Sequence, residues 1–124
     1  MIILSAEFEL QNGDSSVIRA EMEDYMERRR SKQPLEFPSA GSAFKRYPGR
    51  FTAQMIDEAG LKGFSVGGAE VSTKHAGFIV NRGGATAEDV RKLVSEIKEI
   101  IYKREGIHIV SEIRYLSEDG AREI

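Results

Sequence analysis

An apolar stripe of helical period constrains the fold more than any other feature of this 124-residue sequence. Its members recur every three or four residues, as on one side of an α-helix: Val90, Leu93, Val94, Ile97, Ile100 and Ile101. Thr86 and Asp89 precede it as a variant of the capping box, and Gly106 follows it as a stop. Because burying one such side chain contributes roughly 1.5–3 kcal/mol, the stripe predicts a long helix that anchors the core.

Shorter patterns around this helix predict a small sheet and two further helices. Apolar spacing indicates helices over about 16–30 and 52–59, the second closed by Gly60. Short strands are expected near 64–66, 69–71, 77–81 and 107–115, with Gly63, Gly67 and Gly68 at tight turns or close backbone approaches. We therefore expect an α+β domain with about three helices against a small mixed β-sheet.

The two ends of the chain carry different signals. Apolar residues alternate with polar ones over 2–10, which predicts a strand with one buried face. Asn12 and Gly13 then mark a turn, so 1–12 forms an orphan strand before a domain at 13–116. The polar tail at 117–124 is expected to fray.

Composition excludes several classes of function. No run approaches the roughly 18 apolar residues of a membrane span, and no basic region opens a secretion signal. We therefore expect a cytoplasmic protein that does not associate with a membrane. With no cysteine and two histidines, no metal site is expected. The net charge of -2 argues against nucleic acid as a partner, but a local basic cleft can still bind a phosphorylated ligand.

The segment 38–49 has the composition of an active-site loop. Gly41 permits unusual backbone conformations and Pro38 and Pro48 stiffen the ends, so Ser42 can be presented at a fixed angle, with the cations 45–46 close by. An ordinary turn explains the same residues equally simply. The sequence by itself leaves both interpretations open.

Three further groups have both a structural and a functional interpretation. The cations at 28–32 complement the dipole of a helix end, and they can also bind phosphate. His75 lies at a turn, where it is either a surface or capping residue or a ligand contact. Glu112 and Arg114 are two apart in an expected strand, where they form a pair on a solvated face or contribute to a site.

Five runs of sequence resemble UDP-N-acetylenolpyruvoylglucosamine reductases in order and spacing. They are 33–46 (QPLEFPSAGSAFKR), 57–63 (DEAGLKG), 67–81 (GGAEVSTKHAGFIVN), 106–107 and 111–114 (SEIR). The resemblance covers nearly the whole chain, but it corresponds only to the end of the family's flavin domain, at 1–12, and to its substrate-binding domain.

The resemblance implies an activity and its site residues. The family reduces UDP-N-acetylglucosamine enolpyruvate to UDP-N-acetylmuramate with FAD and NADPH, during peptidoglycan synthesis. It implies that Ser42 protonates the α carbon and that Glu112 stabilises the enolate-like charge. Arg29 and Lys32 would contact the diphosphate, and Lys45, Arg46 and His75 would also belong to the substrate-binding residues.

The resemblance also implies what this chain lacks. FAD and NADPH would be bound mainly by an N-terminal flavin domain, which becomes the expected partner, so the isolated chain is expected to be colourless and inactive. The alternative is a non-catalytic module that binds a UDP-sugar or packs against a partner.

Overall fold

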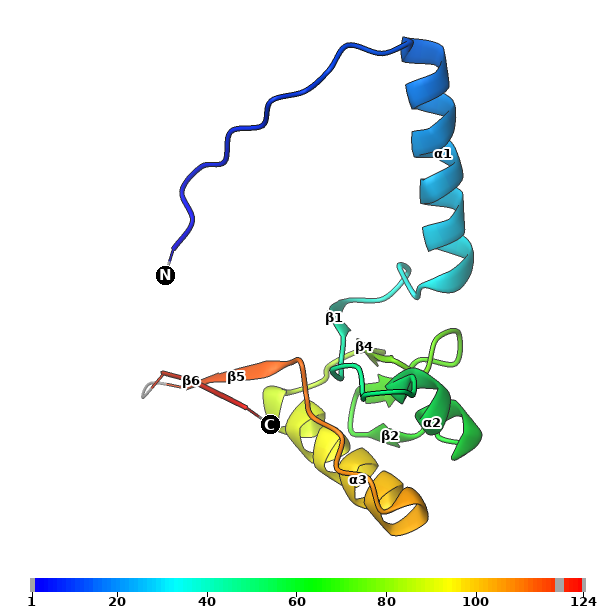
Figure 1. Cartoon of the computed structure of the whole chain (residues 1–124). Coiled ribbons are helices and arrows are strands. Elements are labelled where there is room, and N and C mark those ends of the chain that lie inside the picture. The colour runs from blue at the N-terminus through cyan, green and yellow to red at the C-terminus, as the bar shows by residue number, and fades with distance from the viewer. Residues whose placement is uncertain (1, 118–119, 124) are drawn as a thin grey trace. The chain divides into compact units, whose positions relative to one another are not determined.

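The computed structural model describes residues 2–117 and 120–123. The chain divides into two units, Met1–Ser31 and Lys32–Ile124, and each is treated by itself. The first contains an extended segment and the helix α1, and the second contains the sheet and the remaining helices (Figure 1). Across the described residues, no helix has both the length and the apolarity needed to cross a bilayer.

Helix α1 spans Ser15–Lys32, close to the predicted range. Its first turn is capped by Asp14, whose carboxylate accepts the N–H groups of Ser16 at 2.9 Å and Val17 at 3.1 Å. Hydrogen bonds from the hydroxyl and N–H of Ser16 and the N–H of Val17 lower the pKa of Asp14. No residue of the helix is buried, and Ile18 and Met22 of its apolar side are 45% and 65% exposed. The capping of α1 is therefore observed, but its predicted apolar face has no cover within this unit.

The strand predicted over 2–10 is not formed. These residues are extended without strand pairing, and Ile2, Phe8 and Leu10 are 77–86% exposed. A strand requires a neighbour for its N–H and C=O groups, and the described residues of this unit provide none. The alternating pattern favours a strand, but the strand can form only when a second strand pairs with it. The domain boundary expected after residue 12 stays a prediction.

The second unit is built on a four-stranded sheet in the order β1-β4-β3-β2. Its strands are β1 (Ser39–Ser42), β2 (Ser65–Val66), β3 (Ala69–Val71) and β4 (Phe78–Asn81). Every described pair is antiparallel, whereas a mixed sheet was predicted. The reason is connectivity: β2, β3 and β4 follow one another through short turns, and a parallel pair would need a long crossover.

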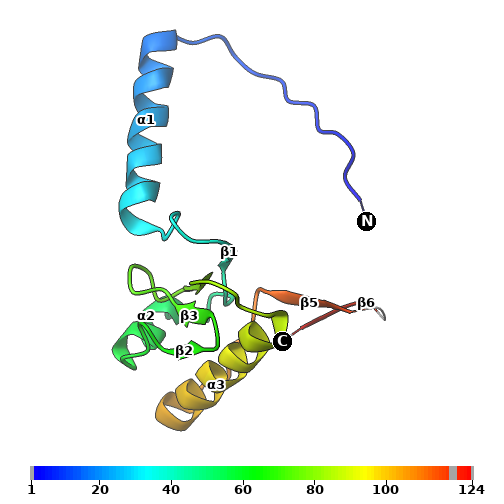
Figure 2. The same cartoon turned by 180° about the vertical axis from the view of Figure 1, so that it is seen from behind.

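Two helices cover this sheet, which confirms the α+β class. Helix α3 spans Ala87–Glu105 and packs against β2, β3 and α2 (Thr52–Glu58), as Figures 1 and 2 show from opposite sides. Thr86 and Asp89 form the predicted capping box, with bonds of 3.1 and 2.9 Å, and Gly106 ends the helix at φ 68°. The most buried part of the apolar stripe and α2 form the centre of the core: Leu93, Val94, Ile97, Ile101, Met55 and Ile56.

Gly68 explains how closely the β2–β3 turn approaches the start of α3. A Cβ at this position would lie 2.3 Å from the carbonyl oxygen of Gly83 and 2.5 Å from the nitrogen of Ala85. Both are backbone atoms that cannot rotate away. The close backbone approach predicted for this glycine-rich stretch is confirmed.

The C-terminal part departs from the prediction. Of the strand expected at 107–115, only residues 114 and 115 lie in a strand. The part before them contains a single bridge between Ser111 and Phe44, followed by a bend at Glu112. A hairpin of β5 (Arg114–Ser117) and β6 (Gly120–Glu123) follows, so most of the tail expected to fray pairs with β5; residues 118, 119 and 124 lie outside the described residues. In both views the hairpin projects away from the sheet (Figures 1 and 2).

Arg50 connects the loop after β1 to the ends of two helices. Its guanidinium lies 2.8 Å from the carboxylate of Glu105 at the end of α3 and 3.4 Å from that of Glu58 at the end of α2. The hydrogen bond from Arg50, aided by Arg104, lowers the pKa of Glu105 below its usual value. The loop is thereby held to the helical layer by charge as well as by packing.

This ion pair predicts a specific pH dependence of stability. Because the pKa of Glu105 is lower in the folded chain than in the unfolded chain, its contribution is complete above the unfolded pKa of about 4.3. It is lost as the pH falls through the folded pKa. The difference in unfolding free energy between the parent and Glu105→Gln should therefore be largest at neutral pH and shrink in acid.

Urea unfolding at neutral, mildly acidic and strongly acidic pH measures this difference. Glu96→Gln, which removes a carboxylate from the same helix, is the matched control. A Glu105→Gln difference that stayed constant down to strongly acidic pH would contradict the role given to the ion pair.

Candidate functional site

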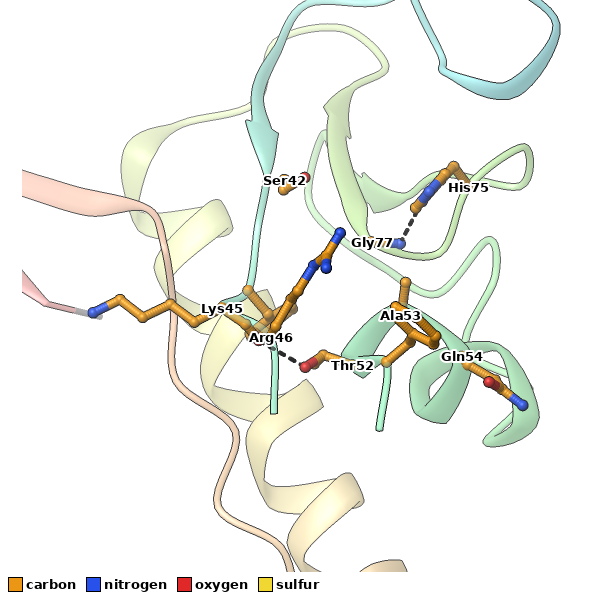
Figure 3. Close-up of a pocket in the computed structure, with 10 residues that line it drawn as sticks. Ser42, Lys45, Arg46, Thr52, Ala53, Gln54, His75 and Gly77 are labelled. Atoms are coloured by element: carbon orange, nitrogen blue, oxygen red, sulfur yellow. Dashed lines mark hydrogen bonds between the residues drawn. The ribbon is translucent and has the colours of Figure 1, made fainter. Parts of the chain in front are cut away.

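A pocket of about 410 Å³ lies where β1, the start of α2 and the β3–β4 turn meet (Figure 3). All three parts belong to the second unit. The residues lining it are Ser42, Phe44, Lys45, Arg46, Phe51, Thr52, Ala53, Gln54, His75 and Gly77. The structure therefore brings together four of the seven site residues expected from sequence: Ser42, Lys45, Arg46 and His75.

Ser42 is the last residue of β1 and is exposed to the pocket. The next residue, Ala43, is fully buried, and its N–H donates to the carbonyl of Gly77 at 2.8 Å. Gly41 takes a φ of 81°, and the register of β1 against β4 shifts between Ser39 and Ser42. The predicted loop is thus an irregular strand end, in which a buried neighbour fixes the position of the serine.

The two adjacent cations differ in direction. Figure 3 shows Arg46 pointing into the space framed by Ser42, Gly77 and Ala53, while Lys45 extends away from these residues. The backbone of Lys45 is held because its carbonyl accepts the hydroxyl of Thr52 at 2.7 Å. Arg46 therefore contributes the main positive charge within the pocket, on the side of Ser42.

His75 forms the wall opposite Ser42, at the β3–β4 turn where the sequence predicted it. Its Nδ1 accepts the N–H of Gly77 at 3.0 Å, and its ring meets Phe78 edge to face at 5.0 Å. Because Nδ1 acts as the acceptor, the neutral ring carries its proton on Nε2. The ring can offer a ligand one hydrogen-bond donor, and its role in binding stays a prediction.

Sequence reasoning missed several residues of the pocket. Gln54 lines it from the first turn of α2, with its amide donating to Glu58 at 2.7 Å. Phe51, Ala53 and Gly77 also belong to the wall. One sequence signal could have pointed to these residues, namely that the predicted helix begins only ten residues after Ser42. The sequence does not show, however, that the chain turns back and brings this helix against Ser42.

The backbone of Glu112 is bonded to the segment that carries Ser42, but Glu112 does not line the pocket. Its N–H donates to the carbonyl of Ala43 at 2.9 Å, so its segment runs directly beside that of Ser42. The residue is exposed and is not among those that line the pocket. The bend at Glu112 also removes the regular alternation that was expected to place it beside Arg114. A joint site of Ser42 and Glu112 stays a prediction.

Arg29 and Lys32 occupy the final turn of α1 and are exposed. Cations at this position complement the helix dipole. Arg29 belongs to the first unit, whereas the pocket belongs to the second. Their assignment to a diphosphate therefore also stays a prediction.

Among the described residues, the starts of the two long helices are already occupied by carboxylates. In α1 and α3 the carboxylates of Asp14 and Asp89 already accept N–H groups at the helix start, and a negative charge there repels a diphosphate. The remaining helix, α2, has seven residues. Among the residues that the structure describes there is also no group of three or more His, Cys, Asp or Glu that could hold a metal ion.

The fold and pocket together define a small α+β domain with a serine and an arginine in one cleft. Residues 33–116 match the family described as UDP-N-acetylenolpyruvoylglucosamine reductase, C-terminal domain. The chain therefore belongs to this family.

Individual relatives agree with this assignment. The chain is 50% identical over 118 residues to a UDP-N-acetylenolpyruvoylglucosamine reductase of Pediococcus pentosaceus, covering 95% of this chain and 39% of that protein. It is 46% identical over 119 residues to the one of Clostridium novyi, covering 96% and 39%. The crystal structure of the reductase from Thermus caldophilus matches 73% of this chain and 34% of its own, with a TM-score of 0.65 and 40% identity. The chain thus spans about two fifths of the length of its curated relatives.

The pocket wall predicts the effect of a methyl group at Gly77. A Cβ there would lie 2.9 Å from Cε1 of His75 and 3.0 Å from Cβ of Ala53, so Gly77→Ala should displace the His75 ring and cost roughly 1–3 kcal/mol through overpacking. Urea unfolding measures the loss, and the NMR shifts of the ring protons report the displacement.

A double-mutant cycle supplies the control. In a His75→Ala background the atoms of the His75 ring are gone and only the contact with Cβ of Ala53 remains, so the cost of Gly77→Ala should fall. Unchanged ring shifts together with unchanged stability would show that the pocket wall is more compliant than these distances indicate.

Proposed function

We propose that this chain provides the substrate-binding and proton-donating part of a reductase of peptidoglycan synthesis. The reaction converts UDP-N-acetylglucosamine enolpyruvate to UDP-N-acetylmuramate. The main support is the position of Ser42, exposed at a strand end in a pocket that also contains Arg46, within a chain of the reductase family. Such a protein would act in the cytoplasm.

Substrate binding would depend on charge and on the placement of donors. Arg46 can form two parallel hydrogen bonds with a phosphate or carboxylate, and the Nε2 of His75 offers another donor. Lys45 would add a weaker, long-range attraction because it extends away from the pocket centre. Arg29 and Lys32 are proposed to contact the diphosphate once the whole enzyme is assembled.

The chemistry assigned to this chain is proton transfer and charge stabilisation. In the whole reductase, reduced FAD would supply the hydride, with NADPH as the electron source, from a flavin domain that serves as partner. The hydroxyl of Ser42 would donate its proton to the α carbon, forming a C–H bond, and water would then reprotonate the alkoxide. Glu112 would contribute to stabilising the charge as it develops on the carboxylate. The bond between the Glu112 N–H and the Ala43 carbonyl supports this pairing, since it holds the two segments together.

A non-catalytic module is the second candidate. The exposed apolar residues of α1 and of 2–10 favour it, because they leave a large surface for a partner to cover. In that case the pocket would bind a UDP-sugar or remain unused.

Replacing Arg46 tests the anion site on the chain itself. Arg46→Ala should weaken the binding of inorganic pyrophosphate and of UDP at least about tenfold, since hydrogen bonds to charged groups contribute about 1.5–3 kcal/mol. Lys45→Ala, the adjacent cation, should weaken both only a few-fold and mainly at low salt. NMR titration of each variant gives the affinities. Equal effects of the two substitutions would contradict the direction assigned to these side chains.

Replacing Ser42 tests the proton transfer and requires the chain fused to a matching flavin domain. Ser42→Ala should leave reduction of the flavin by NADPH nearly unchanged, because no proton is yet needed at the α carbon. Reoxidation by the enolpyruvyl substrate should slow at least about a hundredfold. Glu112→Gln should slow the same half-reaction.

Stopped-flow absorbance at the flavin band separates the two phases. If Ser42→Ala slowed flavin reduction, or left reoxidation at the parent rate, the serine would be a structural residue only.

A further inference from the structure

Phe51 is the most exposed aromatic ring that lines the pocket. It is 61% exposed, whereas Phe44, also in the wall, is 7% exposed. An exposed aromatic ring beside a polar cleft offers a flat apolar face against which a planar ligand can be buried. The stripe in α3 and the sheet form the core without it.

The backbone presents this ring from a rigid base. The carbonyl of Phe51 accepts the N–H groups of Gln54 at 3.0 Å and Met55 at 3.2 Å, which fixes it at the start of α2. The next residue, Thr52, is 4% exposed and donates its hydroxyl to Lys45. The loop from 46 to 51 is further closed by the bridge of Tyr47 and Arg50. The backbone that carries the ring is therefore held before any ligand arrives.

The chemistry around the ring matches one class of ligand. The guanidinium carbon of Arg46 lies 5.7 Å from the centroid of Phe51, so a flat apolar surface and a phosphate-binding group are adjacent. A nucleoside diphosphate has the same two parts, a planar base and a charged diphosphate joined by a ribose. Stacking on an aromatic ring is a common way in which proteins hold an unpaired base.

We propose that Phe51 is the stacking platform for the pyrimidine base of the nucleotide, with Arg46 directed to its diphosphate. This inference rests on the proposed function and adds a binding residue that decides specificity for the nucleoside part. The apolar ring contributes little to an anion alone, so it distinguishes UDP from pyrophosphate.

The test compares UDP with inorganic pyrophosphate by NMR titration of the full chain. Phe51→Ala should weaken UDP binding at least about fivefold, because base stacking contributes about 1–3 kcal/mol, and should leave pyrophosphate binding unchanged within twofold. Phe51→Tyr should retain the parent affinity for UDP. Tyr102→Ala is the matched control, since Tyr102 is 48% exposed, lies outside the pocket lining and stacks on His108.

Each outcome is decisive. If Phe51→Ala leaves the ratio of UDP to pyrophosphate affinity unchanged, the stacking role is wrong while the anion site of Arg46 stands. An equal loss for both ligands would show that Phe51 only supports Arg46 and would overturn the stacking role. If the unmodified chain binds neither ligand, the proposed nucleotide site fails, and this inference fails with it.

Discussion

The buried backbone of Ala43 is the constraint on which the functional part of this protein depends. Its N–H donates to Gly77 at 2.8 Å and its carbonyl accepts from Glu112 at 2.9 Å, so one fully buried residue joins the β3–β4 turn to the C-terminal segment. The hydroxyl of Ser111, 2% exposed, also lies 3.3 Å from this carbonyl. Because buried backbone groups cannot exchange these partners for water, they must be satisfied where they lie. Because Ser42 directly precedes Ala43, its backbone is held in place by the same bonds.

The rest of the pocket is organised by contacts that reach across the fold. Thr52 holds Lys45, and Arg50 reaches Glu58 and Glu105, so the loop that carries Arg46 is attached at both ends. None of these contacts needs a ligand. Such preorganisation lowers the cost of ordering a site when substrate binds. It is compatible both with a reductase domain and with a binding module, since each requires a formed pocket.

The first unit has the opposite character. Helix α1 has a satisfied first turn but no buried residue, and the apolar residues of 2–10 remain exposed. Caps are local interactions that a helix can make by itself, whereas burial requires a second surface. The chain spans about two fifths of the length of its curated relatives.

The sequence by itself determined the parts that depend on near neighbours. The stripe of α3, its capping box, its stop at Gly106 and the turn containing His75 all follow from residues within about four positions of each other. The family was also readable from short ordered runs, and the match at 33–116 confirms it.

Only the tertiary structure decided the features that join distant segments. Strand direction, the bend at Glu112, the different directions of Lys45 and Arg46, and the inclusion of Phe51 and Gln54 in the pocket depend on partners far away in sequence. Residues 2–10, which do not form the expected strand, show the same dependence on distant partners. The alternation of apolar and polar residues indicates which face of a strand would be buried, but not which segment would cover it. Local patterns specify conformation through short-range hydrogen bonds and sterics, whereas a site requires the chain to fold back on itself.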